Sequence, residues 1–106
     1  MPLYVLLTKL TEQGRKTVKA RPERIREVNK EVAAMGGKLI AQYATLGRYD
    51  FVSVVEADNN QSIARISVEL GARGTLQIST MPAMDVTTFI SRVWAPRPSN
   101  RRPKLD

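Results

Sequence analysis

The chain has 106 residues, of which 17 are basic and 10 acidic, and it contains no cysteine and no histidine. This length corresponds to one domain that can bury a core without cross-links. The lack of cysteine excludes disulfides, thiolate zinc sites and thiol catalysis. The lack of histidine removes the commonest general base and metal ligand. The composition therefore predicts one basic domain with no metal site, no cofactor and few options for side-chain chemistry.

The formal net charge of +7 is concentrated in two segments. Residues 9–30 hold eight basic and three acidic side chains, residues 31–94 five and six, and residues 95–106 four and one. Basic segments attract phosphates or acidic partners. They are also typical of a solvated helix face and a solubilising tail. The sequence leaves both interpretations open.

Residues 95–106 mark a boundary, since they hold three of the six prolines and one large aliphatic residue. So little apolar surface cannot offset the entropy of ordering. We therefore expect a folded domain over 1–94 and a flexible, basic, proline-rich tail over 95–106. No stretch approaches the roughly 20 apolar residues of a membrane span, and residues 1–7 read as a strand rather than a signal peptide. We expect a cytoplasmic protein without membrane contact.

The first part of the chain predicts a strand followed by an interrupted helix. An apolar, β-prone run predicts the strand over 3–8. Thr11 is a possible N-cap, although Gly14 stands where a capping box needs glutamate. Arg21 and Pro22 predict a break before the helix resumes. The resumed helix ends at two glycines and has four apolar residues at helical spacing, Ile25, Val28, Val32 and Met35.

The second part predicts three strands and two helices. Strands are expected over 39–46 and 49–56, joined by a turn at Gly47 and Arg48. Cap residues at 58–60 start a helix that ends at Gly71, and a strand follows over 75–81. Asp85 then caps a short helix with one apolar side, formed by Val86, Phe89, Ile90, Val93 and Trp94.

The order of these elements is βαββαβ with one further helix. Its usual solution is an α+β, ferredoxin-like fold: a four-stranded antiparallel sheet with helices on one face, plus a short C-terminal helix. The right-handed crossover rule then predicts the strand order fourth, first, third, second.

Both faces of the central strands are apolar in sequence. We expect one set of alternate residues to face the helices, namely Leu3, Val5, Leu7, Val52 and Val54. The other set then lies on the second face, with Tyr4, Leu6, Phe51, Val55 and the neutral polar residues Thr8, Gln42, Ser53, Thr75, Gln77 and Ser79. Such a mixture fits a small-molecule cleft or ordinary strand solvation. Because the second face is apolar, we expect it to be covered. The C-terminal helix or another subunit could cover it, and we prefer another subunit.

The topology brings three loops to one end of the sheet, at 8–16, 47–50 and 71–74. They carry the candidate ligand-binding residues Arg15, Lys16, Gly47, Arg48, Tyr49, Asp50 and Arg73. We expect Asp50 to pair with Arg73 or Arg48, and the other basic groups and loop amides to form an anion pocket. Alternatively, the glycines only serve turns and the ion pair only joins two loops. Tyr4 and Thr8 complete the candidate set.

Residues 46–57, with Gly47, Tyr49 and Asp50 at their start, resemble the GYD domain. This bacterial and archaeal family is named for its glycine–tyrosine–aspartate motif. Further segments that look like the family are 4–11, 14–17, 21–24 and 70–74. The resemblance covers about residues 2–90. It implies a ferredoxin-like fold of the dimeric α/β-barrel type and no established activity.

A weaker resemblance is to the RNA recognition motif, which stacks bases on aromatic residues of the first and third strands. Tyr4, Tyr49 and Phe51 lie near those places. However, Asp50 is acidic where that motif has a small residue, and Val54 replaces an aromatic one. The predicted central open face also has no basic residue for phosphates. We expect no nucleic-acid binding, except nonspecifically through the tail.

These observations favour a homo-oligomeric domain that binds a small molecule or an anion and acts in regulation. A cofactor-independent enzyme on the same scaffold is an alternative, which we favour less. Acid–base work would depend on a strongly perturbed carboxyl group such as Asp50 or Glu56, or on a tyrosine. A third interpretation is a basic interaction module that binds nucleic acid or an acidic protein.

Overall fold

The computed structural model describes residues 1–94, so the predicted tail over 95–106 lies outside the described residues. Residues 1–94 form four strands and five helical segments. In chain order they are β1 (Leu3–Leu10), α1 (Glu12–Ala20), α2 (Arg24–Ala34), β2 (Lys38–Ala44), β3 (Phe51–Glu56), α3 (Asn60–Gly71), β4 (Leu76–Ala83), α4 (Val86–Phe89) and the π-helix η1 (Ile90–Trp94).

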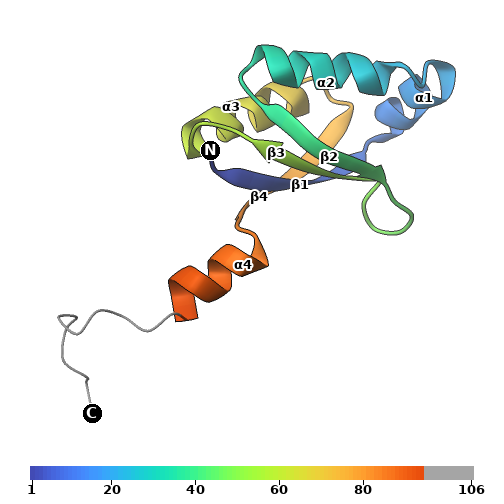
Figure 1. The fold of residues 1–106 in the computed structure, drawn as a ribbon. Helices are drawn as coiled ribbons and strands as arrows, with labels where there is room; N and C mark the ends of the chain where they lie inside the picture. Colours follow the sequence, from blue (N-terminus) through green and yellow to red (C-terminus); the bar gives the residue numbers. More distant parts are fainter. Residues whose placement is uncertain (95–106) are drawn as a thin grey trace, which may run out of the picture.

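The strands form one antiparallel sheet in the order β2-β3-β1-β4. Helices α1, α2 and α3 cover one face of this sheet, and the other face is left open (Figure 1). The strand order and the two layers are those of the predicted ferredoxin-like fold, so the fold class is confirmed.

Three predicted caps start helices. Thr11 caps α1 by accepting a hydrogen bond from the Gly14 amide at 3.1 Å. Asn59 caps α3 and Asp85 caps α4 in the same way, each at 2.8 Å. Such side-chain oxygens satisfy amide groups that have no partner inside the helix. A break also separates α1 from α2 at Arg21 and Pro22, as the sequence predicts.

The assignment of residues to the two sheet faces was wrong for β1 and β3 and for Gln42 of β2, whereas Gln77 and Ser79 of β4 lie on the open face as predicted. Tyr4, Leu6, Thr8, Ser53 and Val55 are buried under the helices, and the alternate residues lie on the open face. Alternation could not decide this, because both sets are largely apolar. Two polar members of the buried set find partners there: the Tyr4 hydroxyl donates to Asn60 Oδ1 at 2.6 Å, and Ser53 Oγ accepts from Gln42 Nε2 at 3.1 Å. Buried polar groups are tolerated when they are hydrogen-bonded in this way.

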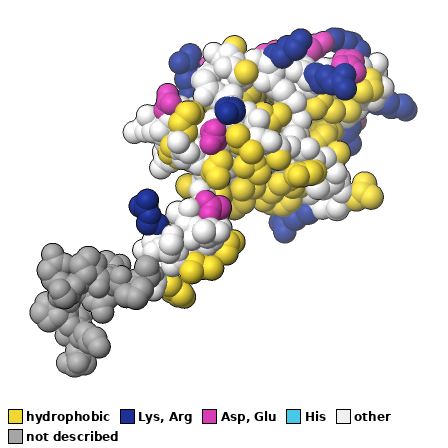
Figure 2. Space-filling view, in the orientation of Figure 1, with side chains coloured by type: hydrophobic (Ala, Val, Ile, Leu, Met, Phe, Trp, Pro, Cys, Tyr) yellow, Lys and Arg dark blue, Asp and Glu magenta, His cyan; other side chains and the backbone are white. Residues whose placement is uncertain are grey.

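The open face is an apolar surface without a cover among the described residues. Leu3, Val5 and Leu7 of β1 lie beside Val52 and Val54 of β3, and all five are only half-buried. Hydrophobic side chains gather over the underside of the sheet in Figure 2. The expectation that this face is apolar therefore holds, although a different set of residues forms it.

The C-terminal helical segment does not lie over the open face. Figure 1 shows α4 below the sheet and displaced from it. Its apolar residues are exposed, and Phe89 packs on Trp94, with ring centroids 5.6 Å apart. In residues 1–94, therefore, the C-terminal helix does not cover the open face, which was one of the two predicted covers.

Both edge strands are irregular. The register of β2 against β3 shifts between Leu39 and Ala41, which is a β-bulge at Ile40. At the other edge, β4 contains Pro82 opposite Tyr4. Neither edge is a regular strand along its whole length.

Candidate functional site

The three predicted loops do meet at one end of the sheet. The Thr11 hydroxyl donates to the Gly74 carbonyl at 2.7 Å, and the Thr11 amide donates to the Thr75 carbonyl at 3.0 Å. On the other side of β1, the Asp50 amide donates to the Thr8 carbonyl at 2.8 Å. The loop-rich end is therefore a connected structure rather than a set of separate turns.

The predicted pairing of Asp50 with Arg73 or Arg48 was wrong. Asp50 Oδ2 accepts a hydrogen bond from the Leu10 amide at 2.7 Å, and it forms no ion pair within residues 1–94. The reason is the uneven length of the strands: β1 pairs with β4 as far as Leu10, but with β3 only as far as Thr8. The carboxylate takes the place of the missing backbone acceptor.

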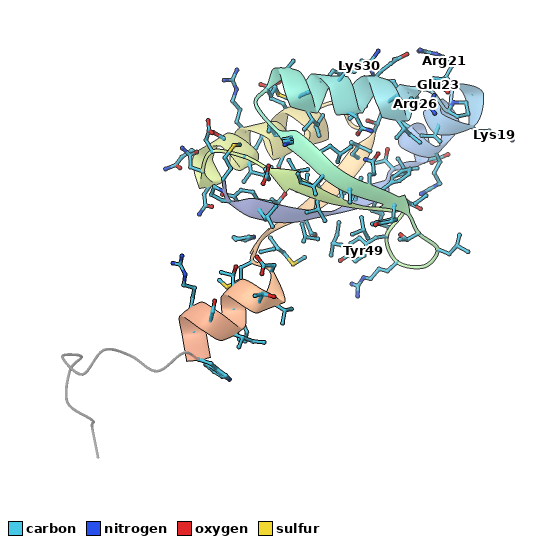
Figure 3. All side chains as sticks on the ribbon, viewed as in Figure 1. Lys19, Arg21, Glu23, Arg26, Lys30 and Tyr49 are labelled. Carbon is cyan, nitrogen blue, oxygen red and sulfur yellow. The ribbon has the colours of Figure 1, made fainter. Side chains whose placement is uncertain are left out.

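The other candidates at this end are partly engaged. The Arg15 guanidinium donates to the Leu10 carbonyl at 2.9 Å, and Lys16 pairs with Glu12 at 3.6 Å on the exposed side of α1. Gly47 has a φ of +120° in the β2–β3 loop, a conformation that favours glycine. Tyr49 belongs to the same loop (Figure 3), and its carbonyl accepts from the Thr45 hydroxyl at 2.7 Å.

Tyr4 and Thr8 separate in the structure. Tyr4 is 1% exposed and is bonded to α3 near the opposite end of β1, so it is not part of the loop-rich end. Thr8 is 9% exposed and faces a cavity under the helices. That cavity is the second feature of the candidate site.

The cavity has a volume of about 130 Å³ and lies between α1, α2 and the sheet. Most of its wall is apolar; the side chains include Leu6, Leu10, Val28, Leu39, Phe51, Leu76 and Ile78. Its polar wall consists of Thr8, Asn29, Gln42, Ser53, Thr17 and Thr75, with Arg24 and Arg73 as the charged members. An apolar space with a few polar groups is the usual form of a small-molecule site.

Three of the polar residues satisfy one another. Asn29 Nδ2 donates to Gln42 Oε1 at 2.8 Å, and Gln42 Nε2 donates to Asn29 Oδ1 and Ser53 Oγ, both at 3.1 Å. This chain of hydrogen bonds ties α2 to β2 and β3. The Thr8 hydroxyl takes part in none of the side-chain hydrogen bonds found in residues 1–94.

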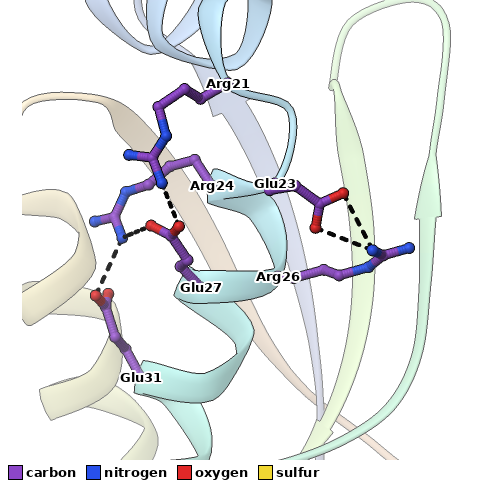
Figure 4. A network of polar contacts seen from close by, with 6 residues as sticks. All are labelled: Arg21, Glu23, Arg24, Arg26, Glu27 and Glu31. Carbon is purple, nitrogen blue, oxygen red and sulfur yellow. Dashed lines mark hydrogen bonds and ion pairs between the residues drawn. The ribbon is translucent and has the colours of Figure 1, made fainter.

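Charged residues of α2 and of the turn before it form a network (Figure 4), and Arg24 of this network also lines the cavity. Arg24 Nη1 lies 3.3 Å from Glu27 and 3.2 Å from Glu31. Arg73 also pairs with Glu31, and Arg21 pairs with Glu27. The hydrogen bond from Arg73, followed by that from Arg24, lowers the pKa of Glu31 despite its partial burial. The hydrogen bond to Glu31 raises the pKa of Arg24.

The remaining basic residues of α2 point elsewhere. Arg26 pairs with Glu23 at 3.0 Å and does not line the cavity, and Lys30 lies on the side of α2 away from the sheet (Figure 3). Within residues 1–94 no group of three or more acidic, histidine or cysteine residues could hold a metal ion. The helices of this part of the chain are too short or too polar to cross a membrane.

Comparison with known proteins assigns the chain to a family. The sequence model of the GYD domain matches residues 4–93. The chain belongs to the GYD domain family. A relative of this GYD domain in Thermus thermophilus is named "Glutamine synthetase and cystathionine beta-lyase binding protein". The two are 43% identical over 94 residues, which span 88% of this chain and 99% of the relative.

Two crystal structures share the fold of this GYD domain. FFRP-DM1 has a TM-score of 0.53 and 23% identity, over 79% of this chain and 100% of that one. TTHA0845 from Thermus thermophilus has a TM-score of 0.51 and 17% identity, over 80% of this chain and 95% of that one. Identities this low show the shared fold only.

Sequence reasoning missed the charged network of this GYD domain. Arg24, Glu27 and Glu31 are spaced by three and four residues, which places them on one face of a helix. That spacing could have predicted the ion pairs within α2, since it places charges of opposite sign side by side, next to the apolar face of the helix. The contribution of Arg73, from a loop 42 positions after Glu31, needed the structure.

Proposed function

We propose that this protein is a homo-oligomeric binding protein that regulates a metabolic enzyme by docking on it. The partner would be an enzyme of the type named for the Thermus relative, glutamine synthetase or cystathionine beta-lyase. One observation carries the proposal: the 43% identity extends over 99% of that relative. Almost no chain of the relative is left outside the aligned part, so a surface within that part is the natural place for the named binding.

The direct test is a binding measurement between the full chain and each of the two enzymes from the same organism, by biolayer interferometry. We expect saturable binding to at least one enzyme, and a change in that enzyme's activity. An unrelated acidic protein serves as the control, because a net charge of +7 attracts acidic surfaces at low salt. Binding that is equal for both enzymes and the control, or absent for both enzymes, would contradict the proposal.

The homo-oligomer is supported by the open face of the sheet. Antiparallel sheets with one solvated face normally carry polar residues there, whereas Val5, Leu7, Val52 and Val54 make this face apolar. Large apolar patches mark interfaces. We assign the face to a second copy of the chain, because its centre is uncharged and two copies can approach without repulsion.

Light scattering after size-exclusion chromatography tests this part. Val54 lies opposite Val5 at the centre of the open face, so Val54→Lys is expected to convert an oligomer into a monomer. The matched control is Val68→Lys on α3, where the side chain is already 70% exposed. A monomeric wild-type protein at micromolar concentration, or equal effects of both variants, would argue against the second copy.

A further inference from the structure

We propose that the cavity between α2 and the sheet binds a small organic acid, with the carboxylate on Arg24 and Arg73 and an apolar body about the size of a benzene ring in the cavity. This inference concerns a ligand and not the enzyme partner proposed above. It depends neither on that partner nor on the oligomeric state.

The size and wall of the cavity define the body of the ligand. Its volume of about 130 Å³ is close to that of an engineered apolar cavity of about 150 Å³ that stays dry and binds benzene. The wall combines residues of the sheet and of α2, such as Leu6, Phe51 and Val28. A compact aromatic or branched aliphatic body fits such a space better than a polar one.

The charged residues beside the cavity define the head group. Three arginines, Arg21, Arg24 and Arg73, are matched by only two carboxylates, Glu27 and Glu31. The ion pairs of Arg24 and Arg73 use Nη1 alone, while a guanidinium has five N–H donors. A second carboxylate can therefore bind to the remaining donors, and bidentate binding of that kind is strong and specific.

Glu31 shows that this place stabilises a carboxylate. Both arginines donate to it, and together they hold its pKa below the ordinary value. The side chains of Arg24 and Arg73 are 28% and 34% exposed, so the attraction is less screened by water than on an open surface. A ligand carboxylate here would share the same two cations with Glu31.

Thr8 adds a polar contact inside the cavity. Its side chain lines the space and is nine-tenths buried, yet it is absent from the side-chain hydrogen bonds within residues 1–94. Ser53, Gln42 and Asn29 on the same wall are satisfied by one another. No side-chain oxygen or nitrogen in residues 1–94 is fully buried without a partner, so the Thr8 hydroxyl is accessible from the cavity. It is available to hydrogen-bond a hydroxyl or keto group on the ligand.

The test is a titration of the isotope-labelled full chain followed by heteronuclear NMR. The probes are benzoate, 4-hydroxybenzoate and benzamide, the last being the uncharged analogue of benzoate. We expect benzoate to shift the amide signals of residues that line the cavity, and benzamide to bind at least tenfold more weakly. Thr8→Val is expected to weaken 4-hydroxybenzoate more than benzoate.

Variants of the charged residues complete the design. Arg24→Gln and Arg73→Gln are each expected to weaken benzoate at least tenfold. Arg26→Gln is the matched control on the same helix, because Arg26 pairs with Glu23 and does not line the cavity. Equal binding of benzoate and benzamide would overturn the acidic head group. Shifts outside the cavity, equal shifts with inorganic phosphate, or no shifts at millimolar benzoate would overturn the site.

Discussion

At Gly14, the absence of a Cβ atom allows the first helix to start close to the sheet. It is buried where α1 leaves the sheet, and a Cβ at this position would overlap the Thr75 carbonyl oxygen. The Thr11 amide donates to that same carbonyl. The absence of a side chain therefore allows α1 to approach β4 closely enough for the two loops to bond.

Gly14→Ala is expected to destabilise the protein by about 1–3 kcal/mol, because the extra methyl group overpacks a closed contact. Urea unfolding measures the change. Gly71→Ala is the matched control: it also lies in a helix, and a Cβ there meets no atom within 4 Å. That variant is expected to be neutral or more stable by up to about 1 kcal/mol. Equal losses for the two variants would contradict this account of Gly14.

Asp50 has a structural role that its position in the family motif did not reveal. Its carboxylate accepts from the Leu10 amide, so Asp50→Ala is expected to cost about 1.5–3 kcal/mol, the usual contribution of a hydrogen bond to a charged group. Asp50→Asn keeps an acceptor and should lose less. Thermal unfolding measures both, and Glu69→Ala at an exposed position of α3 should stay within about 0.5 kcal/mol of wild type. A neutral Asp50→Ala would refute this role.

At the scale of elements, two polar contacts join α2 to the sheet and to the loop after α3. Asn29 connects it to β2 through Gln42, and Glu31 connects it to the loop after α3 through Arg73. Three arginines of the basic segment are paired with glutamates of α2 and with its N-cap residue Glu23. Much of the positive charge in residues 9–30 is therefore balanced locally.

The contact of Glu31 predicts a pH dependence. The folded state lowers the pKa of Glu31, so this carboxylate stabilises the fold above its ordinary pKa of about 4.3. The contribution is lost as the pH falls through the lower, folded-state value. Between about pH 5 and pH 3, the melting temperature of Glu31→Gln should fall less than that of the wild type.

Melting curves across this range provide the measurement. Glu69→Gln serves as the control, because Glu69 is exposed and forms no ion pair within residues 1–94. It should retain the wild-type slope. A Glu31→Gln variant with the same slope as the wild type would show that the contact with Arg73 and Arg24 contributes nothing to stability.

The elements were more predictable than their contacts. Thr11, Asn59 and Asp85 act on amides three residues away, so a local pattern was enough to place three helix starts. The sequence could not predict which face of the sheet packs on the helices, because Leu3, Val5 and Leu7 on one face are as apolar as Tyr4 and Leu6 on the other. The decisive contact, from Tyr4 to Asn60, joins residues 56 positions apart.

The candidate site was predictable only in part for the same reason. The meeting of three loops followed from topology, which depends on the order of elements alone. The partners of Asp50 and Arg73 depended on strand lengths and on the position of α2. Several opposite charges were available to each residue in the sequence, and spacing could not choose among them.

At the scale of the whole molecule, Trp94 provides a fluorescence probe for the proposed association with a second copy. It is the single tryptophan of the chain, and it is 72% exposed with no cover within residues 1–94. If a second copy packs against the exposed side of α4 and η1, the fluorescence maximum should move to the blue as the protein concentration rises. Acrylamide quenching should weaken in parallel.

The Val54→Lys variant supplies the reference for this measurement. Because it is expected to remain monomeric, its emission should stay red-shifted at every concentration. An emission maximum that is independent of concentration in a wild-type protein shown to be oligomeric would place α4 and η1 outside the interface.

The irregular edges of the sheet limit how such molecules can assemble. A chain that adds strand to strand needs a regular edge, and here the bulge at Ile40 and the proline at position 82 interrupt both. Bulges and prolines are common means of blocking this kind of growth. Association through the open face, in contrast, would bury that face in the contact, so that it could not bind a further subunit. If the protein forms the homo-oligomer proposed above, this sheet would favour a closed particle of few subunits over a continuous strand-to-strand polymer.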